Sequence, residues 1–204
     1  MKQNTGIKII YGLMGIFLVG VGVAFNASSM LGNDPIGIVY DGTRNVFNLS
    51  TEQLGMASNV VNIVLIILLW FTGKKYVNIG TFIYLIPYGF FVSIGTKLYS
   101  LLIISDTLAG RSLAGLLGCL SLYTGVAIFI AVDIGLDPFT GLVMTIRDKL
   151  SWDYKRTKIC FDIFMMILGI LLGGKLGIIT LITAFTAGPV IQFISERVQM
   201  LLLR

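Results

Sequence analysis

Long apolar stretches separated by short polar turns dominate the chain. A transmembrane helix needs about 20 mostly apolar residues. Six stretches approach or exceed that length, at residues 7–29, 53–72, 78–104, 112–132, 157–173 and 177–195. Almost no sequence remains between them for a soluble domain. We therefore expect one all-α polytopic membrane domain with six transmembrane helices.

The two halves of the chain repeat one another when the sequence is shifted by 103 positions. Gly12–Arg44 then aligns with Gly115–Arg147 without a gap, and ten of the 33 aligned positions are identical. We interpret residues 1–105 and 110–204 as two three-span repeats. Because three is an odd number of crossings, the second repeat is expected to be inverted relative to the first, as in many channels and secondary transporters.

Small residues extend the repeat and predict close helix packing. Gly12, Gly15 and Gly22 in the first span match Gly115, Gly118 and Gly125 in the fourth. Glycines that share one helix face let two helices approach closely, so we expect the first span to pack against the fourth or another span. Two further pairs match at an offset of 99 and carry the repeat into the third and sixth spans, namely Thr81 with Thr180 and Gly89 with Gly188.

Each repeat also contains a Gly-x-Asp-Pro motif, at Gly32–Pro35 and at Gly135–Pro138. Asp is a favoured N-cap residue, and Pro fits the first helical turn. The motif predicts a short helix in each repeat, over residues 36–47 and 139–150, too short to cross a bilayer. These helices either dip into the bundle or lie as amphipathic helices at the membrane interfaces.

The composition agrees with a membrane protein and indicates its orientation. The chain is 56% hydrophobic and 12% charged, with a mean hydropathy of +0.91, whereas soluble domains are about 25% charged. With six spans, eleven Lys and Arg residues fall on the side of the two termini and four on the other. This bias predicts cytoplasmic termini. The net charge of +5 therefore requires no nucleic-acid partner.

The residue inventory excludes several kinds of chemistry. The chain has no histidine, which removes His-based zinc sites and both Ser-His-Asp and Cys-His catalytic groups. Cys119 and Cys160 fall inside predicted spans, where we interpret them as buried small residues. We expect no catalytic residues, no cofactor and no metal, and therefore no enzyme.

Polar residues in or beside the spans are the candidates for a substrate pathway. They are Asp34, Asn59, Asn62, Asp137 and Asp162. Asp34 and Asp137 either cap their short helices or line a path near the axis between the repeats. Asp162 matches Asn59 in the repeat and lies one turn from Lys158, so it either forms an ion pair or serves the pathway. Arg44 and Arg147 either pair with acids or headgroup phosphates, or hold an anionic substrate.

A resemblance to a known family rests on short motifs. These are the glycine-rich first span, Leu31–Pro35, the turn Gly73–Lys75, and the pair Gly80–Thr81. The chain resembles the YczE/YyaS/YitT group of bacterial integral membrane proteins over Gly12 to Gly89 and again over Gly115 to Gly188. The resemblance implies a location in the bacterial inner membrane and names no reaction.

Two functions fit these observations. The first is a secondary permease for a small molecule or ion, with its pathway between the two repeats. The second is a non-transporting membrane subunit or regulator that binds a partner membrane protein, or a second copy of the chain, through helix contacts. The first predicts dependence on Asp162, and the second predicts dependence on Gly15 and Gly118.

Overall fold

The computed structural model describes residues 5–102 and 107–202, and over these residues the chain is helical with no strand. Its α-helices are α1 (Thr5–Ser29), α2 (Pro35–Val46), α3 (Leu54–Thr72), α4 (Ile79–Leu101), α5 (Leu108–Val132), α6 (Pro138–Leu150), α7 (Tyr154–Leu171) and α8 (Ile178–Leu202). Short 3-10 turns precede α3 and α4, at Thr51–Gln53 and Lys74–Tyr76.

Five helices in the described part of the chain are long and apolar enough to span a bilayer. They are α1, α3 with its 3-10 turn, α4, α5 and α8. The fifth predicted span, 157–173, corresponds to α7, an 18-residue helix whose sequence includes Lys155, Arg156, Lys158 and Asp162. These charges lower its hydropathy and set it apart from the other five. The last two residues of the predicted third span, 103 and 104, lie outside the described residues.

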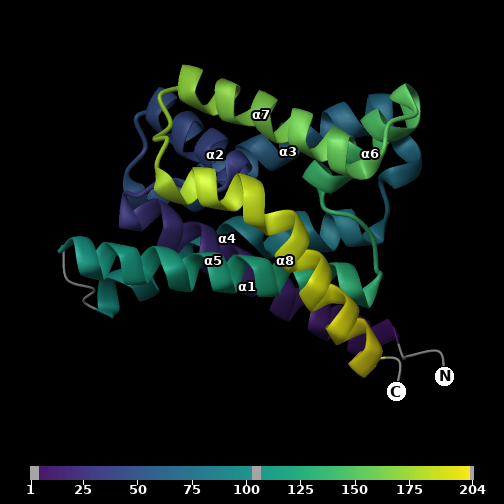
Figure 1. The fold of residues 1–204 in the computed structure, drawn as a ribbon, viewed down its shortest axis with the longest axis horizontal. Helices are drawn as coiled ribbons and strands as arrows, with labels where there is room; N and C mark the ends of the chain where they lie inside the picture. The colour runs from purple at the N-terminus through teal and green to yellow at the C-terminus, as the bar shows by residue number, and fades with distance from the viewer. Residues whose placement is uncertain (1–4, 103–106, 203–204) are drawn as a thin grey trace.

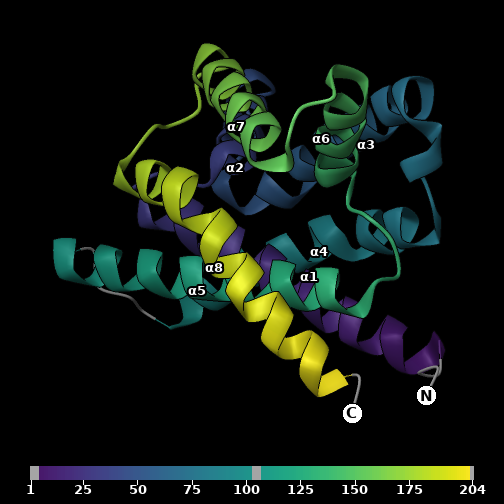
Figure 2. The ribbon, with the colours of Figure 1, turned by 45° about the vertical axis from the view of Figure 1, so that its right-hand side comes forward.

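The helices form two layers (Figures 1 and 2). In one layer α1 packs against α4 and α5, and α5 packs against α8. In the other layer α2 packs against α3 and α7, and α6 also packs against α3 and α7. Buried hydrophobic side chains from both layers form a common core, with Val23 and Phe129 from the first and Leu65 and Met165 from the second.

The contact between α1 and α5 is the most extensive between any two helices, and glycine makes it possible. A Cβ atom on Gly15 would lie 2.8 Å from the carbonyl oxygen of Gly125, and one on Gly22 would lie 2.6 Å from that of Gly118. The two backbones are therefore in direct contact along this face. The predicted packing of the first span against the fourth is confirmed.

The loops that precede the two short helices make matching contacts. Gly32 and Gly135 have φ angles of +101° and +146°, which glycine adopts readily. Beyond them, the carbonyl of Leu136 accepts a hydrogen bond of 2.9 Å from Thr81 Oγ1 at the start of α4. The carbonyl of Leu31 accepts one of 3.0 Å from the amide of Ile179 at the start of α8.

The short helix α2 lies inside the bundle, and α6 buries part of its length against neighbouring helices. Residues 35–40 of α2 are all buried, and α2 packs against α7 while α6 packs against α3. Between the two placements left open by the sequence, burial favours helices that dip into the bundle. Their observed starts, Pro35 and Pro138, precede the predicted starts by one residue because Pro occupies the first helical turn.

The helix contact between α3 and α4 in the first half has no equally extensive counterpart between α7 and α8 in the second half. α3 packs against α4, and Gly55 meets Gly89 backbone to backbone. α7 and α8 diverge from the turn that joins them, and they make few contacts (Figures 1 and 2). No atom lies within 4 Å of the position that a Cβ would take on Gly188, the residue that matches Gly89. The two layers thus touch between α3 and α4 and separate between α7 and α8.

The glycine contacts predict opposite effects for two Gly→Ala changes. Gly22→Ala should lower the free energy of unfolding by about 1–3 kcal/mol because the new methyl group overlaps the α5 backbone. Gly188→Ala should leave it unchanged or raise it by up to about 1 kcal/mol because the site is open and Ala favours helix. Unfolding of both variants in detergent, followed by circular dichroism, checks this. Equal losses in the two variants would contradict the packing described.

Candidate functional site

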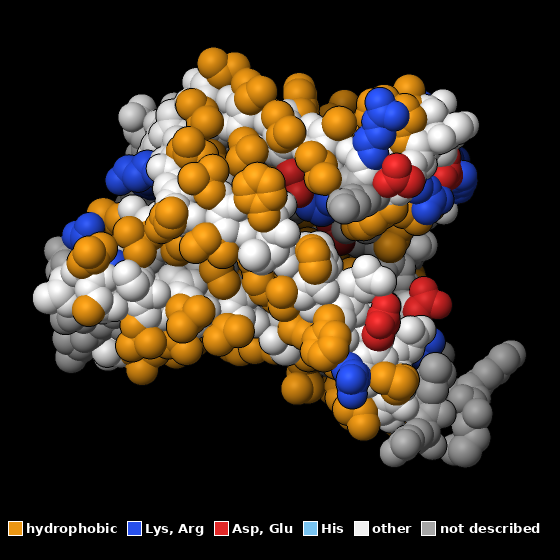
Figure 3. All heavy atoms as spheres, viewed as in Figure 1, with side chains coloured by type: hydrophobic (Ala, Val, Ile, Leu, Met, Phe, Trp, Pro, Cys, Tyr) orange, Lys and Arg blue, Asp and Glu red, His pale blue; other side chains and the backbone are white. Residues whose placement is uncertain are grey.

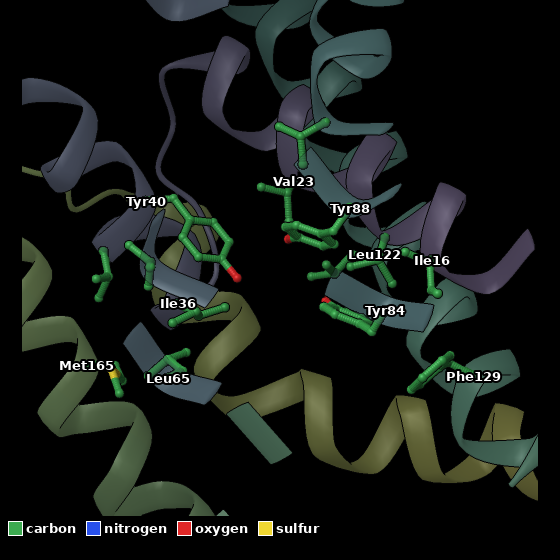
Figure 4. Packing of buried hydrophobic residues seen from close by; sticks show 14 of the residues in the cluster. Ile16, Val23, Ile36, Tyr40, Leu65, Tyr84, Tyr88, Leu122, Phe129 and Met165 are labelled. Carbon is green, nitrogen blue, oxygen red and sulfur yellow. The ribbon is translucent and has the colours of Figure 1, made fainter. Parts of the chain in front are cut away.

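Three tyrosines meet between the two layers. Tyr40 comes from α2, and Tyr84 and Tyr88 come from α4 (Figure 4). The rings of Tyr84 and Tyr88 are stacked with centroids 4.9 Å apart, and the ring of Tyr40 lies edge-on to Tyr88 at 5.9 Å. Tyr40 OH donates a hydrogen bond of 3.3 Å to Oδ1 of Asn62 on α3. The centre of the molecule is therefore aromatic with polar edges.

Asp34 lies at the start of α2 beside this aromatic centre. Asn33 holds the turn, since its Nδ2 donates to the carbonyl of Val23 on α1 at 3.1 Å. The Asp34 side chain makes no capping hydrogen bond of standard geometry, and its Oδ1 atom is buried without a partner. The amides of Ile36 and Gly37 still interact with the carboxylate, so the predicted cap is incomplete.

Asp137, the residue that matches Asp34, is placed differently. Its Oδ1 accepts a hydrogen bond of 2.9 Å from the amide of Thr140, so it caps α6 as the motif predicts. The same motif thus gives a complete cap in the second half and an incomplete one, with an unpaired Oδ1, in the first.

Asp162 and Lys158 form an ion pair on α7. The Nζ of Lys158 lies 2.6 Å from Oδ1 of Asp162, and Asp162 is only 7% exposed. The ammonium group also lies 4.9 Å from the centroid of the Phe139 ring on α6. The predicted salt bridge is present.

Asn59 and Asn62 make separate contacts within the first half of the chain. Asn59 Oδ1 accepts a hydrogen bond of 3.0 Å from the amide of Gly89 on α4, which ties α3 to α4. Asn62 lies one turn further along α3, and its Oδ1 accepts a hydrogen bond from the Tyr40 hydroxyl. Asn59 and its match Asp162 therefore have different partners.

Charged groups lie close to the starts of both short helices. The Lys158–Asp162 ion pair lies on α7, which packs against both α2 and α6. Figure 3 shows acidic and basic side chains in the recess between α7 and α8, while apolar side chains cover the outer faces of the helices around it. This region is the candidate functional site.

Asn26 on α1 belongs to the same region, although the sequence analysis did not single it out. It is fully buried, its Nδ2 has no partner, and its Oδ1 lies 3.9 Å from the Cys119 sulfur on α5. An amide inside an apolar span is a detectable signal. Comparison of the two repeats does not reveal Asn26, because the residue at the matching position in the second half is Phe129.

The two arginines lie away from this centre, each paired with an acid. Arg44 binds Asp41 at 2.7 Å, and Arg147 binds Asp148 at 2.7 Å. Hydrogen bonds from Lys75, Tyr76 and Arg147 hold the pKa of Asp148 well below its usual range. The expected pairing with acids is therefore what the structure shows for both arginines.

A pocket of about 280 Å³ opens at the end of the molecule opposite the termini. Its lining combines the Arg44–Asp41 pair with Glu52, Lys97 and Lys175. Lys97, which the sequence places within the third span, thus lines this pocket beside other charged residues.

A family model matches residues 6–196, and its description is a family of unknown function, DUF6198. The chain belongs to this family. It is 26% identical over 181 residues to an uncharacterized protein of Haemophilus influenzae, covering 89% of this chain and 80% of the relative. It is 20% identical over 203 residues to the uncharacterized membrane protein YczE of Bacillus subtilis, covering 98% and 92%.

These relatives confirm the resemblance to a YczE-type family of bacterial membrane proteins. No solved structure matches the chain. Its several long apolar helices agree with an integral membrane protein.

The two matched aspartates predict different stability effects. Asp137→Ala should lower the free energy of unfolding by about 1 kcal/mol because the α6 cap is lost. Asp34→Ala should lower it by less, or raise it, because only an incomplete cap is lost and a buried unpaired group is removed. Thermal unfolding of both variants in the same detergent measures the difference, and a larger loss for Asp34→Ala would refute the assignment.

Proposed function

We propose that the chain is a permease built from two inverted repeats, with its pathway between the two helix layers. In this assignment α1 to α4 match α5 to α8, and α7 is the fifth of six spans. The matching contacts support it: α1 with α4 corresponds to α5 with α8, and α2 with α7 corresponds to α6 with α3. Inverted repeats with a polar site near the axis are common among secondary transporters.

The observation that carries the proposal is the difference between the two gates. We define the first gate as the α3–α4 contact and the second gate as the matching α7–α8 gap. The first is closed and the second is open. In an inverted repeat the two gates lie towards opposite membrane faces, and exchanging their conformations moves access to the site from one face to the other.

Residues at matched positions explain which gate is closed. In the first gate Gly55 lets the α3 backbone reach Gly89, and Asn59 bonds to the Gly89 amide. In the second gate Lys158 replaces Gly55 and Asp162 replaces Asn59. A long cation paired with a carboxylate occupies the space that closure would require. The Lys158–Asp162 pair therefore holds the second gate open.

The open gate faces the end of the molecule that carries both termini. α7 and α8 separate towards the α6 end of α7 and the C-terminus (Figure 1), and the space-filling view shows a notch there (Figure 3). The distribution of Lys and Arg predicts that this end is cytoplasmic. The conformation is then inward-open.

Spin-label distances at matched positions test the two-gate assignment. Thr51 and Leu101 mark the first gate, and their matches Tyr154 and Met200 mark the second; all four are exposed. With Cys119 and Cys160 replaced by Ser and Cys introduced in pairs, the 51–101 distance should be the shorter of the two. Double electron–electron resonance in lipid nanodiscs measures both distributions.

A permease should also show a minor population with the distances exchanged, since a few kcal/mol separate such states. One fixed distance for each pair under every condition would contradict alternating access. Such a result would favour the non-transporting subunit, in which helix faces bind a partner chain.

Giving the second gate the residues of the first should close it. We expect the double variant Lys158→Gly and Asp162→Asn to shorten the 154–200 distance while the ion pair is lost. The control is Lys75→Gly with Asp148→Asn, which removes another Lys–Asp pair that lies outside both gates and should leave that distance unchanged. An unchanged 154–200 distance in the first variant would show that the ion pair does not hold the gate.

A further inference from the structure

Three buried polar atoms between the layers lack a hydrogen-bond partner among the described residues. They are Oδ1 of Asp34 and the amide nitrogens of Asn26 and Asn62. Asn26 is 0% exposed and Asn62 is 1% exposed. An unmet buried donor or acceptor destabilises a protein, so three such atoms indicate a place that a ligand completes.

Hydrogen bonds bring the Asp34 turn to α1 and bring α2 to α3. Asn33, the residue before Asp34, donates to the carbonyl of Val23 on α1, one turn before Asn26. Tyr40 on α2 is hydrogen-bonded to Asn62 on α3 at 3.3 Å. The region therefore combines a buried carboxylate oxygen without a partner and unpaired N–H donors on α1 and α3.

The local charge selects the sign of the ligand. The Asp34 carboxylate has a buried oxygen without a partner, and the ammonium group of Lys158 is already bound to Asp162. Arg44 and Arg147 are each bound to a nearby acid and do not complete an anion site here. Burial strengthens the preference, because an opposite charge is the most effective way to stabilise a carboxylate away from water.

The remaining groups select an organic cation over a metal ion. The free atoms of Asn26 and Asn62 are N–H donors, which repel a metal ion, and Oδ1 of Asn62 already accepts the Tyr40 hydroxyl. The rings of Tyr40, Tyr84 and Tyr88 meet in the same place (Figure 4). Aromatic faces attract ammonium groups through cation–π interactions.

We propose that this site binds a small protonated amine that also carries an oxygen acceptor. Its ammonium group binds Asp34 beside the tyrosine rings, and its oxygen accepts from the Asn26 and Asn62 amides. The assignment of this amine as cargo rests on the proposed permease function, whereas the binding site itself does not.

Binding to the purified full-length chain in detergent tests the site. Ethanolamine is the probe, methylamine lacks its oxygen, and acetate lacks its positive charge. Ethanolamine should raise the melting temperature most, methylamine less, and acetate not at all. A shift with acetate, or none with either amine, overturns the proposal. A ligand at 100 times its Kd adds about 2.7 kcal/mol to stability, which such a measurement detects.

Matched variants locate the site. Asp34→Asn should weaken ethanolamine binding roughly tenfold to a hundredfold, the range expected for a charged hydrogen bond. Asp137→Asn keeps an N-cap on α6 and should weaken binding less. Asn62→Leu should remove the advantage of ethanolamine over methylamine, which provides a second test if Asp34→Asn does not fold. Equal affinities in all variants would place the amine elsewhere.

Flux of radiolabelled ethanolamine into proteoliposomes separates the two claims. Binding that depends on Asp34 without flux supports the site and contradicts the permease. Flux that is insensitive to Asp34→Asn supports the permease and contradicts the site. Flux that Asp34→Asn abolishes supports both.

Discussion

The backbone contact between α1 and α5 is the interaction on which the other elements depend. Glycines on both helices let the two chains approach without intervening side chains. Each partner then positions one further long helix, α4 on α1 and α8 on α5. Because hydrophobic attraction between helices is weak inside lipid, close van der Waals packing of this kind is what holds such a bundle together. The second layer then docks through the loops at Leu31 and Leu136.

On this common frame, two substitutions between the halves separate a closed contact from an open one. Gly55 and Asn59 suit close approach, because one has no side chain and the other bonds to an amide of the neighbouring helix. Lys158 and Asp162 suit separation, because they bond to each other and occupy volume. A charged pair in a partly buried place needs good geometry to offset its desolvation. The Lys158–Asp162 pair meets this requirement, because its two charged groups are in close contact and the ammonium group also lies over the Phe139 ring.

The buried polar groups are arranged unequally, and this inequality distinguishes a site from a structural cap. Asp137 meets its helix amide, whereas Asp34 retains an oxygen without a partner, as do the amide nitrogens of Asn26 and Asn62. Such groups destabilise a protein unless something else completes them. Tyr40, which is bonded to Asn62 and packed on Tyr88, connects the polar groups to the aromatic centre.

Much of this organisation follows from the sequence. Apolar length gives the spans, the 103-residue repeat pairs the helices, and Gly-x-Asp-Pro places the starts of α2 and α6, because each depends on residues close together in the chain. The sequence also named Asp34 and Asp162, but it could not show that the Oδ1 of Asp34 stays unpaired while Asp162 binds Lys158. The unpaired state of the Asn26 amide, the meeting of the tyrosines and the gap between α7 and α8 required the tertiary structure. They depend on contacts between helices distant in the chain, which neighbouring residues in the sequence do not specify.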